Sequence, residues 1–456
     1  MTVMERTLTR RTVARYAIGS LGTGGFSTLP GLVLVYYLTD TLGVAALAAG
    51  ILVTAAKVWD VIIDPLIGAR SDRQLVHTGS RRGLMLLGGI TLPLLFILTF
   101  AVPAGVAPVA AGLWVFIAFM LTATAFSLFQ VPYIALPAEL SDGYDQRTRL
   151  LTWRVVVLTL AILLFGAGGP ALRSMGGDNP YLGYLLMAVA AGIVIGVGMV
   201  ISSFVAPKQL PAMVKSASTT SAPAKVSLRA HYAEGIRALR QSQPFRALLL
   251  AFLLQGMATG LMLAGANYVA TWVLHSEDAV TFLFIALIGP ALLVTPLWGV
   301  ISRRIGKERG FLFASILFGA AALSMVMLVW APGAWVYLPV ALCGAGYAGM
   351  QSLPMAMLPD VISYDAVSNG PGRAGIFGGM WTAGETTGMA LGATVLSIVL
   401  AATGYLAHTG TAAVTQSAES ITGIVLSFSV VPAVLIGLSL IPLLRYRLRK
   451  GDIDGL

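Results

Sequence analysis

Twelve apolar segments of about 20 residues or more follow one another along this chain. A bilayer core of about 30 Å takes about 20 helical residues, so each segment is long enough to cross a membrane. Because 57% of the residues are hydrophobic and only 11% are charged, little polar sequence is left for a soluble domain. We therefore expect an all-α membrane protein with twelve transmembrane helices, at residues 13–38, 44–68, 82–102, 110–135, 151–172, 182–205, 245–273, 279–302, 309–330, 335–358, 374–403 and 421–444.

Basic residues are concentrated on one side of the expected bundle. The N-terminal arm, the loops after even-numbered helices and the C-terminal tail hold nearly all 29 Lys and Arg residues, whereas the other loops hold only Arg173. By the positive-inside rule, both termini are expected in the cytoplasm of a bacterial cell whose inner membrane the protein crosses. The net charge of +10 is then an orientation signal and a contact with membrane lipid, and it implies no nucleic acid.

The two halves of the chain repeat each other. Residues 206–244 form the only long polar segment, which predicts a cytoplasmic linker between an N-terminal six-helix bundle at 1–205 and a C-terminal one at 245–456. "PLIGARSDR" after Pro65 is echoed by "PLWGVISRR" after Pro296, and "PYIALP" is echoed by "PMAMLP". Two echoes in the same order predict a duplicated unit and two pseudo-symmetric bundles.

Charges occur inside the second helix, in "KVWDVIIDPLIG". Lys57, Asp60 and Asp64 are spaced i, i+3 and i+7, so they form one stripe on the helix. A charge at bilayer depth costs a few kcal/mol, so such residues normally face a cavity and serve ions or protons. Alternatively, Lys57 and Asp60 only neutralise each other, which would leave Asp64 without a partner.

Several segments resemble a known transporter family. Duplicated six-helix halves and the "GARSDR…GSRRG" loop are similar to the major facilitator superfamily. "YYLTDTLG", "KVWDVIIDPLIG", "VPYIALPAEL", "SQPFRALLLA" and "AMLPDVISYD" resemble signature segments of the glycoside-pentoside-hexuronide:cation symporters, the melibiose permease group. The resemblance covers Tyr16 to Tyr405. It implies a monomeric H+- or Na+-coupled symporter that takes up a glycoside, sugar or sugar acid by alternating access, without a cofactor and without enzyme activity.

The resemblance implies a cation site built from Asp60 and Asp64 with Ser127 and Gln130 of the fourth helix. Gln130 stands where melibiose permeases have an aspartate, and Ile63 stands where sugar-transporting relatives often have an amide. Fewer oxygen ligands favour a proton over Na+, because Na+ needs several ligands to replace its water. Both coupling ions stay open, and no other metal is expected.

The implied substrate site departs further from the family. The helix-1 aspartate position falls on Gly24, the helix-4 indole position on Ile134 and the helix-11 lysine position on Thr386, beside Glu385. Arg154 matches the family's arginine, although an arginine at a helix end is equally explained by topology. The candidate substrate residues are Gly24, Lys57, Gln130, Arg154, Trp381 and Glu385.

Charged loops on the cytoplasmic side are expected to close that side as ion pairs, unless they only determine topology. The basic candidates are Arg73, Arg82, Arg303, Arg304 and Arg373, and the acidic candidates are Glu139, Asp142, Asp360 and Asp365.

Other functions remain open. The loss of sugar-holding side chains at Gly24 and Ile134 fits uptake of a lysolipid or another amphiphile by the same fold. A membrane sensor that does not transport is a further alternative, because the linker could bind a partner. An enzyme is not expected, since the chain has a single cysteine, four scattered histidines, no HExxH motif and no nucleotide-binding glycine loop.

Overall fold

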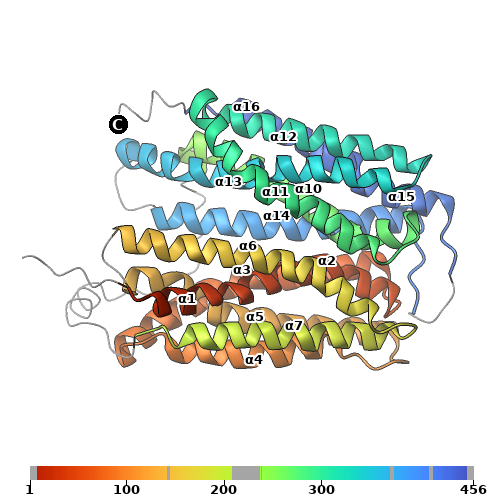
Figure 1. Ribbon diagram of the computed structural model, residues 1–456, viewed down its shortest axis with the longest axis horizontal. Coiled ribbons are helices and arrows are strands. Elements are labelled where there is room, and N and C mark those ends of the chain that lie inside the picture. The colour runs from red at the N-terminus through yellow and green to blue at the C-terminus, as the bar shows by residue number, and fades with distance from the viewer. Residues whose placement is uncertain are drawn as a thin grey trace, which may run out of the picture.

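The computed structural model describes residues 8–140, 144–207, 237, 239–369, 374–409 and 414–448. Long helices lie side by side in two groups, which occupy the lower and upper parts of the molecule in Figure 1. We refer to these groups as the first half and the second half. The first half consists of α1 (Arg10–Ile18), α2 (Ser20–Asp40), α3 (Ala46–Thr78), α4 (Arg82–Phe100), α5 (Pro108–Leu140), α6 (Tyr144–Ser174) and α7 (Pro180–Ser203).

The second half has the same succession of long helices. It consists of α10 (Gln243–Tyr268) with a π-helical turn at Val269–Val273, α11 (Ala279–Ile305), α12 (Lys307–Ser324), α13 (Tyr337–Asn369), α14 (Ala374–Ala402), α15 (Ala418–Phe428) and α16 (Val430–Leu444). Short 3-10 turns lie at Met325–Val329 and Ala334–Val336. The described residues contain no β-strand, only an isolated bridge between Leu42 and Thr409. The all-α fold class is confirmed, with α1–α2 and α15–α16 each counting as one broken membrane helix.

Some helices are longer than their apolar runs predicted. We expected helices to end at residues 68, 135 and 358, but α3, α5 and α13 continue to Thr78, Leu140 and Asn369. Hydropathy marks only the part of a helix that lies in lipid, whereas backbone hydrogen bonding continues into the polar flanks. The extensions place charged residues at the membrane boundary.

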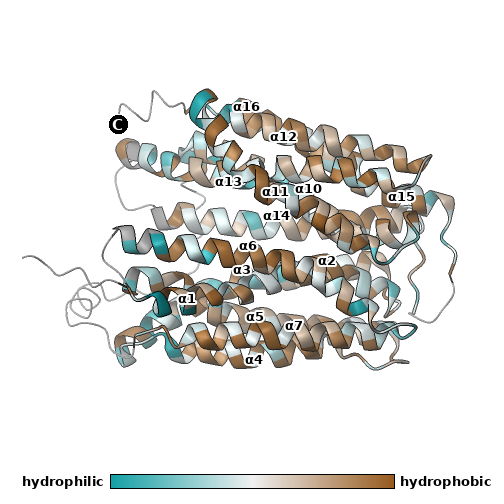
Figure 2. Cartoon of the chain, in the orientation of Figure 1, coloured by the Kyte–Doolittle hydropathy of each residue, from teal (hydrophilic) through white to brown (hydrophobic). Residues whose placement is uncertain are grey.

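The outer surface is suited to lipid. Eleven helices of the described chain are long and apolar enough to cross a membrane, and Figure 2 shows hydrophobic residues along the helices with hydrophilic ones gathered toward their ends. The 33-residue α13 is outside that set, since its sequence is rich in small and polar residues, yet it packs between α11 and α12. The protein is therefore a multi-pass membrane protein.

Helix packing repeats between the two groups. The pairs α2–α6, α3–α5, α4–α5, α4–α7 and α2–α7 have counterparts in α10–α14, α11–α13, α12–α13, α12–α16 and α10–α16. The groups meet through α3 and α14, through α6 and α11, and through α2 and α10. These pairings match the internal repeat in the sequence.

Close contact between α10 and α14 depends on glycine. Gly384, Gly388 and Gly392 are spaced four residues apart on α14, and a Cβ at Gly392 would lie 2.5 Å from the Leu261 nitrogen and the Met257 oxygen of α10. Small residues at this spacing let two membrane helices approach at backbone distance. A side chain at Gly392 would push the two helices apart.

We predict that Gly392→Val lowers the midpoint of thermal unfolding in detergent, because overpacking a tight contact costs about 1–3 kcal/mol. Gly437→Val on α16 is the matched control, since no atom lies within 4 Å of a Cβ at that position. Equal midpoints for the two variants would contradict the account of this contact.

Candidate functional site

Lys57, Asp60 and Asp64 follow one another along one face of α3, as their spacing predicted. Lys57 Nζ is 3.4 Å from Asp60 Oδ2, and it also lies over the rings of Phe26 and Phe119, at 4.9 and 5.5 Å from their centres. Asp60 is only 7% exposed. The ammonium is therefore held between a carboxylate and two aromatic faces, which stabilise a cation in a poorly hydrated place.

Asp64 lies one turn further along α3 and is half-buried. Ser127 of α5, a helix that packs against α3, lies near its carboxylate, as the family resemblance implied. The Oδ1 atoms of both Asp60 and Asp64 are buried without a hydrogen-bond partner among the described residues. Buried oxygens without donors are suited to hold a proton or a small cation.

Gln130 of α5 is not bonded to these carboxylates. Its Oε1 accepts a hydrogen bond of 2.7 Å from the Thr23 hydroxyl of α2, a residue the sequence analysis missed. Thr23 lies beside Gly24 in a glycine-rich run. The only sequence signal that could have identified it as a site residue is a polar side chain inside an apolar helix. The amide thus joins the first and fourth membrane helices.

Arg154 of α6 belongs to a neighbouring polar group. Its guanidinium lies 5.4 Å from the centre of the Tyr133 ring. The Tyr133 hydroxyl donates to the Tyr16 carbonyl at 2.8 Å and is 3.0 Å from the Ser20 hydroxyl. Arg154 Nε is buried without a partner among the described residues, which leaves a donor for an acceptor from outside the chain.

Gly24 does not line a site. A Cβ added there would lie 2.6 Å from the Ala161 Cβ and 3.2 Å from the Leu158 oxygen, so the residue faces the backbone of α6. The expectation that Gly24 contacts substrate is therefore corrected, because the glycine serves close packing of α2 on α6.

The second half contributes Trp381 and Glu385 from α14. Trp381 stacks on Phe252 of α10 at 4.2 Å between ring centres, and its Nε1 is buried without a partner among the described residues. Glu385 is half-buried and lies near Tyr347 of α13. The Tyr347 hydroxyl accepts a hydrogen bond of 2.8 Å from Gln351 Nε2. A carboxylate, a phenol and an indole thus come from two helices of the second half.

Ion pairs at the end with the basic loops differ from the expected ones. We call the end at which α1 begins, on the left of Figure 1, the basic end. There Arg81 bonds Glu139 at 2.5 Å, Asp72 at 2.6 Å and Ser71 at 2.6 Å. Burial raises the pKa of Glu139, against the opposing effect of its bonds to Arg81. Arg81 thus takes the role expected of its neighbours in sequence.

In the second half, Lys307 bonds Asp360 at 2.5 Å. Both ion pairs join helices of the same half, so they do not close the basic end across the two halves. The expected basic partners lie elsewhere: Arg82 stacks on Phe204 at 4.0 Å, and Arg73, Arg303 and Arg304 are exposed. The expectation that these four residues pair with Glu139 or Asp360 is corrected, because those two carboxylates are bonded to Arg81 and Lys307 instead. Asp365 is buried, and Asp142 and Arg373 lie outside the described residues.

At the opposite end, hydrogen bonds between the two halves meet at Asp40, at the end of α2. Its carboxylate accepts bonds from Trp272 Nε1 at 3.2 Å and from the Tyr405 hydroxyl, both of the second half. Thr39 donates to it at 2.5 Å and is itself 2.6 Å from the Tyr268 hydroxyl. We call Asp40 and these four partners the Asp40 cluster. Asp40 belongs to the family-like segment "YYLTDTLG", but its sequence context did not indicate this role.

Arg173, the only basic residue of the loops at that end, adds a second bridge. Its guanidinium donates to Asn267 Oδ1 at 2.9 Å, and Asn267 donates to the Leu32 carbonyl at 2.7 Å. Thr54 of α3 also bonds the Ala390 carbonyl of α14 at 3.1 Å. The two halves are therefore joined by polar bonds at the end opposite the basic loops.

The family described as "MFS/sugar transport protein" matches residues 15–450. The chain belongs to this family of the major facilitator superfamily. Its membership of the glycoside-pentoside-hexuronide symporters, predicted from sequence, is confirmed, and a family of transporters confirms that the chain is not an enzyme.

Similar proteins span nearly the whole chain. A glucuronide carrier protein homolog of Escherichia coli is 24% identical over 94% of this chain and 90% of its own, and the isoprimeverose transporter of Lactiplantibacillus pentosus is 24% identical over 91% and 84%. The crystal structure of a D-xylose-proton symporter superposes with a TM-score of 0.70, 14% identity and coverage of 97% and 98%. At that identity the superposition shows the fold alone.

Among the described residues, no group of three or more His, Cys, Asp or Glu side chains could hold a metal ion.

We predict that Tyr405→Phe weakens closure of the end opposite the basic loops, because it removes one hydrogen bond from the second half to Asp40. A bond to a charged group contributes about 1.5–3 kcal/mol, so the open population should rise by roughly tenfold or more. Spin labels at Ala104→Cys and Ser276→Cys, in a Cys343→Ala background, would report the distance between the halves by electron paramagnetic resonance.

The matched control is Tyr337→Phe, at the start of α13 near the same end, since no hydrogen bond of its hydroxyl is present in the described structure. A distance distribution for Tyr405→Phe that equals that of the control would refute the role given to Asp40.

Proposed function

We propose that this protein is a secondary symporter that takes up a glycoside, sugar or sugar acid together with H+. The observation that carries the proposal is the pair of buried, unpartnered carboxylate oxygens on α3, at Asp60 and Asp64. The relatives named as glycoside or glucuronide carriers, isoprimeverose transporter and putative sulfoquinovose importer support a sugar-type substrate.

A proton fits the carboxylates better than Na+. Lys57 already lies 3.4 Å from Asp60, so a Na+ ion beside Asp60 would be repelled by an ammonium. Gln130 is turned to Thr23, which removes a further oxygen from the set expected from sequence. A proton needs one base, and Asp64 with its free Oδ1 supplies one. Na+ coupling remains the alternative that the test below separates.

The proposed substrate site lies between the halves. Lys57, Gln130 and Arg154 offer donors from the first half, and Trp381 and Glu385 offer an indole and a carboxylate from the second. A sugar needs directional donors and acceptors with an apolar face for its ring, and this set supplies all three. Glu385 lies beside Thr386, the position of the family lysine, so this part of α14 offers a carboxylate and favours a hydroxyl-rich or positively polarised face of the substrate.

Transport would proceed by alternating access. With the basic end in the cytoplasm of the bacterial cell, both termini are cytoplasmic, and the Asp40 cluster closes the outer side of the inner membrane. The conformation described is then the one closed to the outside. The protein would act as a monomer, because the duplicated halves form the complete path.

Coupling follows from charge. Protonation of Asp64 removes the repulsion between it and Asp60, so the loaded site is less costly to enclose in the membrane. If the proton raises the affinity for sugar, the sugar must raise the affinity for the proton by the same factor. Neither ligand alone would then readily allow the protein to change between its outward-open and inward-open conformations.

We predict that Asp64→Asn lowers uphill uptake driven by a pH gradient by more than about tenfold, while sugar counterflow is retained, because the amide mimics the protonated carboxyl but cannot release a proton. The control is Asp178→Asn, an exposed carboxylate between α6 and α7. Uptake that Asp64→Asn still couples to the pH gradient, or that responds only to Na+ in the wild type, would contradict the proposal.

We also predict that glycosides or sugar acids, and not lysolipids, compete for the site. Wild-type protein in proteoliposomes should show binding to members of a glycoside and sugar-acid panel, and Glu385→Gln should weaken it by roughly tenfold through loss of one charged hydrogen-bond acceptor. Binding of lysolipids alone would replace this function with amphiphile transport. Binding without accumulation of any solute would identify a sensor.

A further inference from the structure

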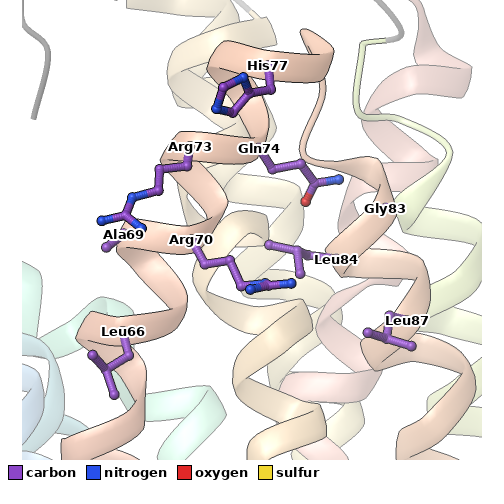
Figure 3. Close-up of a pocket in the computed structure, with 9 residues that line it drawn as sticks. All are labelled: Leu66, Ala69, Arg70, Arg73, Gln74, His77, Gly83, Leu84 and Leu87. Atoms are coloured by element: carbon purple, nitrogen blue, oxygen red, sulfur yellow. The ribbon is translucent and has the colours of Figure 1, made fainter.

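A basic cavity of about 720 Å³ lies at the cytoplasmic ends of α3 and α4, outside the proposed transport site. Figure 3 shows Arg70 and Gln74 extending from α3 toward α4, where Gly83, Leu84 and Leu87 form the opposite wall. Its remaining lining residues, on α3, are Leu66, Ala69, Arg73 and His77. The cavity therefore combines three basic side chains with an apolar wall.

The basic side chains of this cavity are available to a ligand. Arg70, Arg73 and His77 are exposed, and none of the three pairs with a carboxylate of a described residue. Two described carboxylates at this end of the first half, Asp72 and Glu139, are both bonded to Arg81. The cavity thus carries uncompensated positive charge, which favours an anion.

The amide of Gln74 adds a second polar feature. Its Oε1 is buried without a partner among the described residues, and its Nε2 would lie 2.4 Å from a Cβ at Gly83. The absence of a side chain at Gly83 leaves this amide room to face the cavity. A glycerol or sugar hydroxyl could donate to Oε1 while a phosphate lies on the arginines.

The surroundings indicate that the ligand has an acyl chain. Leu66 and Leu87 are 47% and 50% exposed, on helices that cross the membrane, so they contact lipid next to the arginines. Basic pockets between membrane helices on the cytoplasmic side bind anionic lipid headgroups. A soluble phosphate would satisfy the arginines but would leave these leucines without a role.

We propose that this cavity is a binding site for an anionic phospholipid with a hydroxyl-bearing headgroup, such as phosphatidylglycerol. The phosphate lies on Arg70, Arg73 and His77 add positive charge at the rim of the cavity, a headgroup hydroxyl donates to Gln74, and the acyl chain follows Leu87 along α4. This inference depends on the orientation proposed above but not on the transported substrate.

The test is native mass spectrometry of the full-length protein in mixed micelles with equal mole fractions of phosphatidylglycerol and phosphatidylcholine. Wild-type protein should retain phosphatidylglycerol preferentially, and R70Q/R73Q should lower the ratio of the two retained lipids by roughly tenfold. R70K/R73K should keep most of the preference, because lysine also binds phosphate as a point charge.

The matched control is R303Q/R304Q, which removes two exposed arginines from the corresponding end of α11. It should leave the retained-lipid ratio within about twofold of the wild type, because the cavity is unchanged. Gly83→Leu fills the cavity without changing charge and should also lose the preference, which keeps the test valid if R70Q/R73Q fails to fold.

Three results would overturn the proposal. Equal losses in R70Q/R73Q and R303Q/R304Q would show general surface attraction rather than a site. Equal retention of the two lipids by the wild type would remove the selectivity. Displacement of phosphatidylglycerol by millimolar inorganic phosphate would assign the cavity to a soluble anion. None of these results depends on sugar uptake, so failure here is distinct from failure of the proposed transport.

Discussion

The cost of placing charge inside a bilayer governs much of this structure. An unpaired charge at bilayer depth costs about 2.5–3.5 kcal/mol on insertion scales, and α3 alone carries Lys57, Asp60 and Asp64. The fold meets that cost with an ion pair between Lys57 and Asp60, two aromatic rings over the ammonium and a serine beside Asp64. Asp64 keeps one carboxylate oxygen without a hydrogen-bond partner among the described residues. The proposed coupling rests on that incomplete compensation.

A second set of polar groups holds the halves together away from this charge. Asp40, Trp272 and Tyr405 meet at the end opposite the basic loops, and Arg173 reaches Asn267 beside them. These bonds join helices of different halves, whereas the Arg81 and Lys307 ion pairs stiffen helices within one half. Ion pairs within each half, together with hydrogen bonds between the halves at one end of the described structure, suit a protein in which two rigid bodies move against each other.

The sequence could predict the fold because length, hydropathy and an internal repeat leave few arrangements for twelve apolar helices. It also predicted that Lys57, Asp60, Asp64 and Ser127 would lie together, since helical periodicity places the first three on one face. It failed for Arg81 and Lys307, because a charge in a basic loop has several carboxylates within reach and only the helix ends decide among them. It gave no role to Asp40 or Thr23, whose partners lie more than 100 residues away, and it misplaced Gly24, whose role depends on the backbone of α6.

In the proposed function, sugar binding and proton movement occur on the same protein as one coupled event. The most direct measurement is the luminal pH of proteoliposomes that contain the wild-type protein and a trapped pH-sensitive dye, after glycosides and sugar acids are added outside without an imposed gradient. The account predicts that a transported sugar acidifies the lumen as it enters, with no requirement for Na+. Entry of that sugar without any change in luminal pH would contradict it.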